Sequence, residues 1–284
     1  MHEHEKQFSI ARMAKVLKVS QSGYYKWRNT RQSPPSSKEL EDIELTRQIY
    51  EIFRRSRGSY GVRKVTRMIN KNRTNAVNHK RVERLMNENG LFSKTHKKYI
   101  CTTDSDHDEV IADNLINRDF SANKPNEKMV SDTTVVSTEQ GEFYIAGILD
   151  LYGRIPVGLA MSRHNDRHLV IAALKDMLIR GCGSEGCILH SDRGCTYASS
   201  DYRKLISKNG LICSMSRKGD CWDNAPMESF WGKMKTEWLK EKYDTIEEAK
   251  RDIYEYVWHF YPRERPHEAN GYLTPVEYYF NSTI

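Results

Sequence analysis

The sequence predicts an α/β fold, in which a layered domain with a mixed sheet follows small all-helical segments. Two observations predict it. From Lys128 onward, short apolar runs typical of strands alternate with helical patterns, whereas apolar residues before residue 92 recur at helical spacing. Charge divides the chain in the same way: residues 1–100 carry 23 Lys and Arg against 9 Asp and Glu, a net charge of +14, and residues 101–284 have a net charge of −7.

The basic first third predicts a surface that binds a polyanion, and the acidic remainder predicts carboxylates with a separate purpose. No apolar run approaches the roughly 20 residues that a membrane span requires, and the first ten residues are too polar for a secretory signal. Six cysteines without a CxxC pair predict reduced thiols in a cytoplasmic protein. A zinc site of His96, Cys101 and His107 would lack a fourth ligand.

Residues 1–30 predict a helix-turn-helix-like segment. The expected first helix breaks at Lys18 and Val19, and Ser20 is the expected N-cap of a short second helix that reaches Trp27. The first helix is expected from apolar residues at helical spacing, namely Ile10, Met13, Ala14 and Leu17.

Residues 31–92 predict a linker, rich in proline and serine, followed by a basic helical domain. Two helices are expected, over 60–71 and 78–90, the second with Asn78 as its N-cap and Gly90 as its stop. Both have an apolar side and a basic side, which predicts contact with nucleic acid; a solvated helix surface is the alternative reading. The candidate DNA contacts are Arg63, Lys64, Arg67, Lys71, Lys80 and Arg81.

The remaining chain divides into three parts. Residues 93–124 predict a connector with a short helix around residues 109–120, residues 125–262 predict the α/β core, and residues 263–284 predict a C-terminal tail. Within the core, strands are expected over 128–137, 143–150, 154–162, 187–192 and 211–216, and helices over 166–181, 201–210, 225–240 and 246–260. This order predicts a mixed five-stranded sheet.

Three carboxylates stand where a ligand site is expected. Asp132 lies inside the first strand, Asp192 ends the fourth strand, and Glu228 lies in the first turn of a helix. The first and fourth strands of this order can lie side by side, so the two aspartates would repel each other unless a cation lay between them. Oxygen ligands favour Mg²⁺ or Mn²⁺, and a third carboxylate would complete a pair of metal sites for phosphodiester displacement. Taken singly, each carboxylate also has an ordinary explanation as a cap, turn former or helix-dipole partner.

Neighbouring side chains extend this candidate site. Lys235 is seven residues after Glu228, almost two helical turns, so we expect it on the same face, where it could hold a phosphate. His190 precedes Asp192 by two residues and either orients a metal-bound water or fills a polar pocket. Arg193 is a further candidate DNA contact. The opposite, core-facing stripe of this helix is expected to be Met227, Phe230, Met234 and Trp238.

Several sequence blocks match a known family. The spacing of Asp132, Asp192 and Glu228, with 35 residues between the last two, resembles the D,D(35)E arrangement of retroviral integrases and related transposases, which have a ribonuclease H-like fold. More closely, the chain resembles bacterial insertion-sequence transposases of the IS-three group, in particular the catalytic protein of their second reading frame. The matching blocks include "SGYYKW", "YGVRKV", "NHKRVERLM", "HSDRGCTYAS", "SRKGDCWDNAPMESF" and "RPHEANGYLTPVEY", and together with others they extend from about Ser22 to Tyr278.

This resemblance implies a function. It makes Asp132, Asp192 and Glu228 the catalytic carboxylates and ligands of two Mg²⁺ ions, for which Mn²⁺ can substitute, and it makes Lys235 a DNA contact. The implied reaction is DNA cleavage at the ends of an insertion sequence, followed by strand transfer through a circular intermediate. The implied partners are the terminal inverted repeats, target DNA, a second copy of the chain and the upstream-frame protein, in the nucleoid of a bacterial cytoplasm.

The chain also departs from the family at four positions: Met129 replaces Trp, Thr133 replaces Ile, Pro262 replaces Asn and Asn270 replaces Leu. None is a proposed metal ligand, so we expect a repacked but folded domain, with altered geometry at Pro262. Two other functions stay open on the sequence. One is a DNA-binding regulator or inactive transposase remnant, and the other is a ribonuclease H-like nuclease without strand transfer.

Overall fold

A computed structural model of the chain describes residues 1–32, 34–94, 111–217 and 221–281. By its internal contacts the chain divides into two compact units, Met1–Tyr50 and Glu51–Ile284. Among the described helices, none is both long and apolar enough to cross a membrane.

The first unit begins with two helices joined by a tight turn. After the short η1 (His2–His4) come α1 (Ile10–Val16) and α2 (Gln21–Gln32). Lys18 has a left-handed backbone, with φ of 52°, and the Ser20 hydroxyl accepts a hydrogen bond from the main-chain N–H of Gly23 at 3.1 Å. The predicted break and N-cap are therefore confirmed, although α2 continues beyond the predicted end at Trp27.

A long helix that the sequence did not predict follows. This helix, α3 (Ser37–Arg55), begins directly after the proline pair of the expected linker. Ser36 and Glu39 form its start, where the Ser36 main-chain N–H donates to the Glu39 carboxylate at 2.7 Å and the Glu39 N–H donates to the Ser36 hydroxyl at 3.3 Å. The expected linker is therefore much shorter than residues 31–38 indicated, because this reciprocal capping box starts a helix inside it.

The two predicted basic helices are present as α4 (Val62–Asn70) and α5 (His79–Glu88). The Asn78 side chain caps α5 by accepting a hydrogen bond from the main-chain N–H of Lys80 at 2.9 Å. Beyond α5, Gly90 has a left-handed φ of 67°, which glycine adopts without strain. The predicted cap and stop are both confirmed.

The short helix expected around residues 109–120 is absent from its described part, residues 111–120, which is an irregular segment. Asn117 and Arg118 have left-handed φ values of 46° and 66°, which an α-helix excludes. The segment instead runs beside the last strand of the sheet, where the Leu115 N–H donates to the Ser214 hydroxyl at 2.9 Å. Tertiary hydrogen bonds therefore override the helical pattern.

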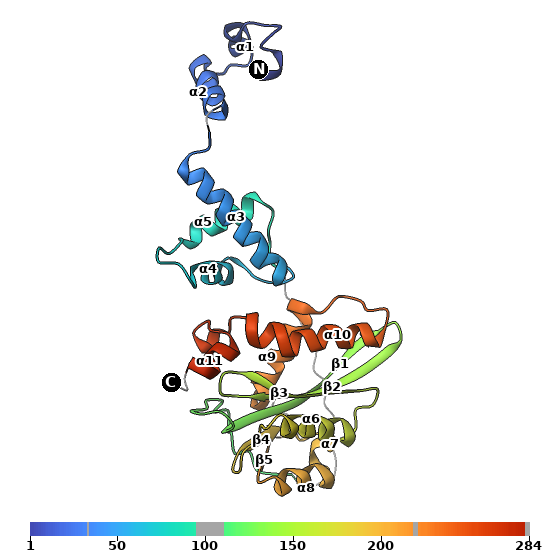
Figure 1. Cartoon of the computed structure of the whole chain (residues 1–284). Helices are drawn as coiled ribbons and strands as arrows, with labels where there is room; N and C mark the ends of the chain where they lie inside the picture. Colours follow the sequence, from blue (N-terminus) through green and yellow to red (C-terminus); the bar gives the residue numbers. More distant parts are fainter. Residues whose placement is uncertain (33, 95–110, 218–220, 282–284) are drawn as a thin grey trace. The chain divides into compact units, whose positions relative to one another are not determined.

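The core contains a five-stranded mixed sheet with the order β3-β2-β1-β4-β5 (Figure 1). β1 pairs antiparallel with β2, and β2 with β3, whereas β4 lies parallel to both β1 and β5. The strands are β1 (Lys128–Thr138), β2 (Gly141–Asp150), β3 (Ile155–Ser162), β4 (Ile188–Ser191) and β5 (Ile212–Met215). The mixed sheet and the adjacency of the first and fourth strands are confirmed.

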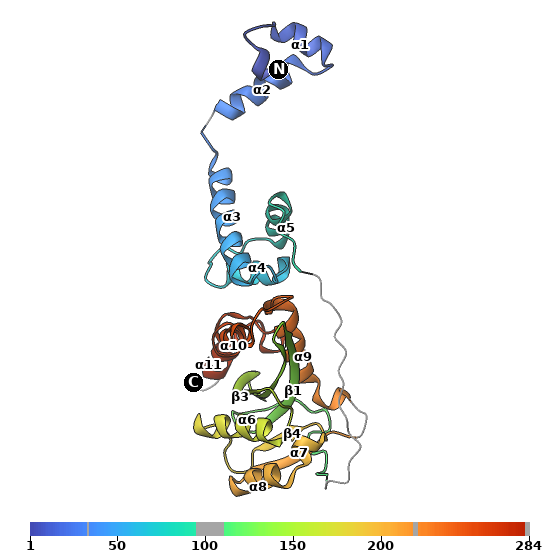
Figure 2. The ribbon, with the colours of Figure 1, turned by 90° about the vertical axis from the view of Figure 1, so that its right-hand side faces the viewer.

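Helices cover both faces of this sheet (Figure 2). On one face, Ala146 and Ile148 of β2 share an apolar cluster with Leu174. On the other face, a side chain at Gly147 would meet the Trp231 ring, so alternate residues of β2 pack against different helical layers. The first layer contains α6 (Arg167–Ile179), α7 (Cys195–Ala198) and α8 (Ser200–Lys208), and the second contains α9 (Ala225–Lys233) and α10 (Ile246–Glu255).

Two of these helices continue with wider, π-helical turns. η3 (Met234–Trp238) extends α9, and η4 (Tyr256–Glu264) extends α10 and contains the buried Pro262. The predicted stripe of Met227, Phe230, Met234 and Trp238 is buried, as predicted. The remaining short elements are η2 (Cys221–Asn224), η5 (Glu268–Asn270) and α11 (Pro275–Asn281).

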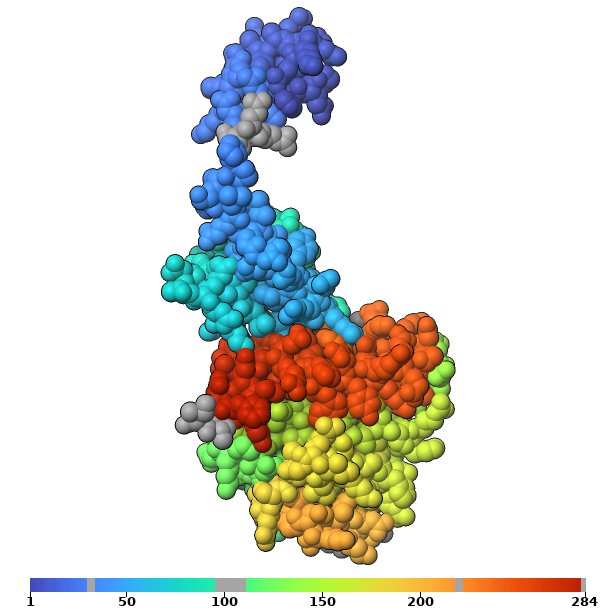
Figure 3. Space-filling model, in the orientation of Figure 1, coloured from blue at the N-terminus to red at the C-terminus, as the bar shows by residue number. Residues whose placement is uncertain are grey.

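The residues after Pro262 pack onto the core as part of a C-terminal layer, defined as residues 246–281 (Figure 3). Arg265 and Asn270 are buried, and the Asn270 amide donates to the main-chain oxygen of Gly153 in the β2–β3 turn at 2.8 Å. Met129, one of the family departures, is fully buried as well. Both Met129 and Asn270 are therefore accommodated inside a packed structure.

Gly147→Ala tests how closely α9 approaches the sheet. The added methyl group would lie 2.7 Å from Cη2 and 2.8 Å from Cζ2 of Trp231, so the helix or the ring must move. We expect the free energy of unfolding to fall by about 1–3 kcal/mol, measured by urea denaturation. Gly232→Ala on α9 is the matched control, since no atom outside its own helix lies near that position, and it should leave stability unchanged or slightly raised. Equal effects of the two substitutions would contradict the close contact.

Candidate active site

The sheet places two of the predicted carboxylates side by side. In the parallel pair of β1 and β4, Val130 is the partner of His190. Asp132 and Asp192 each follow two residues later, so the register carries them to the same level on neighbouring strands. The main-chain N–H of Gly194 donates to the Asp192 carboxylate at 3.0 Å, which orients the carboxylate at the strand end.

α9 brings the third carboxylate to this level. Asn224, just before the helix, donates its side-chain N–H to the main-chain oxygen of Ser131 at 3.0 Å. Gly147 is paired with Asp132 and faces Trp231 of α9, and directly opposed strand residues point to the same side of a sheet. Asp132 therefore faces the helix whose first turn carries Glu228.

These side chains share one electrostatic environment. The pKa of Asp132 is raised well above its ordinary value by burial and by the negative charge of Asp192, with a smaller contribution from Glu228, whereas Lys235 lowers it. Burial also raises the pKa of Glu228. Taken as whole residues, all four lie between buried and exposed. Lys235 lies in the π-helical η3, where the α-helical count from Glu228 does not apply, and its positive charge lowers the pKa of Asp132.

The carboxylates fit a divalent cation in chemistry and charge. Hard oxygen ligands suit Mg²⁺ and Mn²⁺, and a cation would relieve the repulsion that raises the pKa of Asp132. In the part of the chain that the structure describes, no three His, Cys, Asp or Glu side chains are already gathered at the distances of a metal centre. His96, Cys101 and His107, the zinc ligand set that the sequence disfavours, lie outside the described residues.

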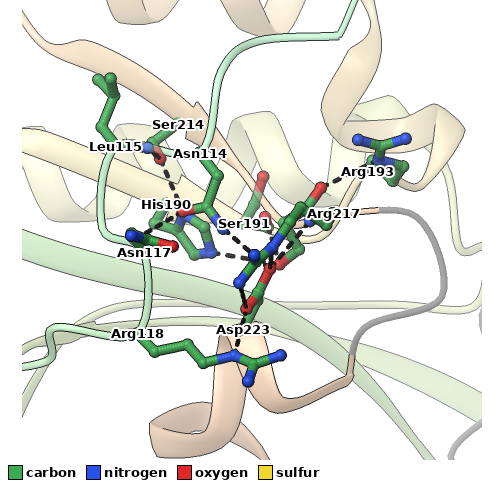
Figure 4. A network of polar contacts seen from close by, with 11 residues as sticks. Asn114, Leu115, Asn117, Arg118, His190, Ser191, Arg193, Ser214, Arg217 and Asp223 are labelled. Atoms are coloured by element: carbon green, nitrogen blue, oxygen red, sulfur yellow. Dashed lines mark hydrogen bonds and ion pairs between the residues drawn. The ribbon is translucent and has the colours of Figure 1, made fainter.

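His190 is a buried, neutral side chain (Figure 4). Its two ring nitrogens lie 2.8 Å from the Ser214 hydroxyl and 3.2 Å from the Ser216 hydroxyl, and no part of the residue is exposed. Burial lowers the pKa of His190 to about 4. The structure therefore favours the polar-pocket alternative over the orientation of a metal-bound water.

Sequence reasoning missed a buried aspartate in η2, just before α9 (Figure 4). Asp223 is 1% exposed, and its carboxylate accepts hydrogen bonds from Arg217 at 3.1 Å, Arg118 at 2.9 Å and Asn114 at 2.8 Å. Mainly because of the Arg217 hydrogen bond, its pKa is lowered below the ordinary value. The only sequence signal was its place in the "SRKGDCWDNAPMESF" block, which does not reveal partners about 100 residues away.

The candidate DNA contacts are not equivalent. Arg63 and Lys80 have exposed side chains. Three others are engaged with the C-terminal part of the chain: Lys64 donates to Glu237 at 3.1 Å, Lys71 pairs with Glu277, and the Arg67 guanidinium lies 4.9 Å from the centre of the Tyr272 ring.

Two candidate DNA contacts remain to be placed. Arg193 donates to the main-chain oxygen of Ser216 at 2.9 Å, and Arg81 is partly buried.

Within the described residues, Cys182, Cys187, Cys195 and Cys213 are free cysteines.

Comparison with known families matches a helical region and the α/β core of the chain. Residues 122–221 and 209–275 each match a family described as an integrase core domain, and residues 39–99 match an HTH-like domain. The HTH-like match covers α4, α5 and most of α3, not the helix-turn-helix outline predicted for residues 1–30.

Full-length relatives decide the family. The chain is 39% identical over 267 residues to the uncharacterized 31 kDa protein of insertion element IS600 from Shigella sonnei, covering 94% of this chain and 97% of that protein. It is 31% identical over 279 residues to transposase InsF of insertion sequence IS3A from Escherichia coli, covering 98% and 96%. The chain belongs to the insertion-sequence transposases. This confirms the resemblance found in the sequence motifs.

Solved structures similar to this transposase include two viral integrase assemblies. One is the simian T-cell lymphotropic virus intasome in complex with a PP2A regulatory subunit, with 11% identity, a TM-score of 0.46, and coverage of 72% of this chain and 67% of that one. Another is the HTLV-2 integrase catalytic core domain in complex with magnesium, with 11% identity, a TM-score of 0.43, and coverage of 56% and 99%.

Asp223→Asn tests the charge network that Asp223 forms with Arg217 and Arg118. Because Arg217 lowers the folded-state pKa of Asp223, the charged carboxylate stabilises the fold fully above the unfolded-state pKa near 4, and this contribution is lost as the pH falls through the lower folded-state value. We expect the variant to be less stable than the wild type by about 1–3 kcal/mol at pH 6. The difference should narrow steadily between pH 5 and pH 3 in urea unfolding experiments.

The control is Asp201→Asn, at a carboxylate whose side chain is half exposed and lies 3.6 Å from Arg167. It should change stability by less than about 0.5 kcal/mol. A pH-independent cost of Asp223→Asn would show that shape and hydrogen bonding, not charge, account for its role.

Proposed function

We propose that Asp132, Asp192 and Glu228 form the catalytic carboxylate triad of this transposase and hold two divalent metal ions. The single observation that supports this best is their placement: two carboxylates at one level of adjacent parallel strands, facing the helix that carries the third. The negative charges of Asp192 and Glu228 reach Asp132 there, which is the arrangement that a dication would relieve.

In the proposed reaction, DNA is cleaved at the ends of the insertion sequence and the freed 3′-hydroxyl attacks a second phosphodiester. Bound Mg²⁺ ions, or Mn²⁺ in their place, would activate the attacking oxygen and stabilise the leaving oxygen. Asp132 and Asp192 would hold them from the sheet, and Glu228 from α9. Lys235 would bind a phosphate beside them, because its positive charge already acts at Asp132.

The proposed substrates are the terminal inverted repeats and target DNA. Arg63 on α4 and Lys80 on α5 are the best placed candidates for backbone phosphates, since both are exposed on basic helices of the HTH-like region. Cleavage at two ends implies at least two copies of the chain on DNA, and the upstream-frame protein is a further proposed partner.

Glu228→Gln tests the triad. The substitution keeps the size of the side chain but removes the charge, so we expect DNA binding to persist and cleavage to fall by at least about a thousandfold. The gene would be placed on a plasmid with its native upstream frame and flanking DNA, and the junction of the joined ends would be amplified from cells. Binding to the same ends would be measured with the purified protein.

The matched control is Glu247→Gln, at an exposed glutamate of α10 paired with Lys250. It should give junctions at the wild-type level. Junctions formed by Glu228→Gln would exclude Glu228 from catalysis. If the wild type makes cuts but never junctions, the nuclease without strand transfer becomes the better account, and if it binds ends without cutting, the regulator does.

Neutralising Arg63 and Lys80 tests the DNA surface. If each contacts one phosphate, Arg63→Gln with Lys80→Gln should reduce the slope of log affinity against log salt by about 1.8 for duplex DNA. Replacing Lys204 and Lys208, two exposed lysines of α8, is the control and should leave the slope unchanged. Fluorescence anisotropy at several salt concentrations gives both slopes. An equal reduction of this slope in both double variants would mean that Arg63 and Lys80 do not contact phosphates more than other exposed basic residues do.

A further inference from the structure

A group of basic side chains gathers where the end of α9 meets the C-terminal layer, and the proposed reaction does not use it. Its members come from four separate parts of the second unit: α4, the β2–β3 turn, α9 and the segment after η4. We call it the basic cluster, and it consists of Lys64, Arg154, Lys233, Arg265 and His267.

A buried ion pair forms the base of the basic cluster. Glu237 and Arg265 are each 3% exposed, and the Arg265 Nε and Nη2 atoms donate to the two Glu237 oxygens at 2.6 and 2.7 Å. Lys64 donates to the same carboxylate at 3.1 Å. The Glu237 carboxylate is therefore already shared by Arg265 and Lys64.

The other three members lack an anionic partner in the described structure. Arg154 donates only to a neutral main-chain oxygen, that of Phe120, at 3.0 Å, and Lys233 has no hydrogen-bond or ion-pair partner among the described residues. The Nδ1 atom of His267 is buried without a partner. Three side chains from three different segments can therefore form further hydrogen bonds with a ligand.

Hydrogen bonds link the segments that carry these groups: the Asn270 side chain donates to the main-chain oxygen of Gly153, next to Arg154, at 2.8 Å, and the Asn270 N–H donates to the main-chain oxygen of His267 at 3.1 Å. Lys233 lies four residues before Glu237, the ion-pair partner of Arg265, and Arg265 is two residues before His267.

The mutual repulsion of these groups agrees with this placement. Burial, and then the charges of Arg265, Lys64 and Arg154, lower the pKa of Lys233 to about 8. Burial, and then the charge of Lys233, lower the pKa of His267 to about 3. Besides Glu237, the exposed Glu268 acts on the cluster through Lys64.

An excess of partly buried positive charge is unfavourable unless an anion compensates it. A phosphate group suits these donors, because its oxygens accept short, charge-assisted hydrogen bonds from ammonium, guanidinium and imidazole groups together. Lys233 and Arg154 are partly exposed, so a phosphate can approach these two side chains from solvent. The buried pair of Glu237 and Arg265 would hold the floor of such a site rigid.

We propose that Lys233, Arg154 and His267 form a binding site for a phosphate group, distinct from the carboxylate site. Lys233 follows Glu228 by five residues, which is about 140° around α9, so the two side chains lie on different faces of the helix. The phosphate that we favour is one of the DNA backbone, and this choice of source rests on the proposed function. The binding of a phosphate does not rest on it.

The test measures phosphate binding by thermal unfolding of the full chain. Inorganic phosphate is titrated against chloride at constant ionic strength for the wild type, Lys233→Ala and Lys233→Arg. We expect phosphate to raise the melting temperature of the wild type, Lys233→Arg to keep the effect, and Lys233→Ala to weaken the apparent phosphate affinity about 10-fold or more. Lys208→Ala, at an exposed lysine far along the chain on α8, should respond as the wild type does.

Two outcomes overturn the site: a wild type that phosphate stabilises no more than chloride does, or equal phosphate responses in the wild type and Lys233→Ala. Because Lys233 has no partner to lose, Lys233→Ala should fold, and Arg154→Gln provides a second variant that should also lose the phosphate response.

A second arm identifies the source of the phosphate. If it belongs to DNA, Lys233→Ala should reduce the salt slope of binding to a random 30-base-pair duplex by about 0.9. If phosphate stabilises the protein but this slope is unchanged, the site takes a free phosphate or a phosphorylated small molecule. Neither arm uses cleavage, so the failure of the catalytic proposal would leave both results interpretable.

Discussion

The contact between α9 and the sheet is the constraint on which the rest of the structure depends. The Trp231 ring occupies the space beside Gly147 that any side chain would fill, and Asn224 ties the start of the helix to the main chain of β1. The segment that carries Glu228 is therefore fixed on both sides of that residue. Since Gly147 is paired with Asp132, the same contact sets the separation between helix and strand at the candidate active site.

Much of the core could be predicted because its signals are local. Strands rich in β-branched and apolar residues, separated by turns, gave the element order, and few sheet topologies suit that order. The adjacency of the strands that lead to Asp132 and Asp192 is consistent with that order and is confirmed by the pairing of β1 with β4. The caps at Ser20 and Asn78 were predictable for the same reason, since each bonds within three residues.

The unpredicted features depend on distant contacts or on backbone geometry. The sequence pattern does not indicate α3, because the proline pair favours a linker. Many charged residues also obscure the two buried positions of this helix, Leu45 and Ile49. The helix expected around residues 109–120 fails because hydrogen bonds to β5 determine that segment. Asp223 and Arg118 are 105 residues apart, and no local pattern links them. The π-helical turn at Lys235 is likewise invisible to a count based on 3.6 residues per turn.

The burial of the C-terminal layer bears on how copies of such a gene lose function. A stop codon after Pro262 would keep the codons of all three proposed catalytic carboxylates, yet it would remove Arg265 from its buried pair with Glu237 and Asn270 from the β2–β3 turn. The remaining polypeptide would leave the buried Glu237 carboxylate with Lys64 but without its bidentate partner Arg265. Quality-control proteases, not a defect in chemistry, would then silence the element.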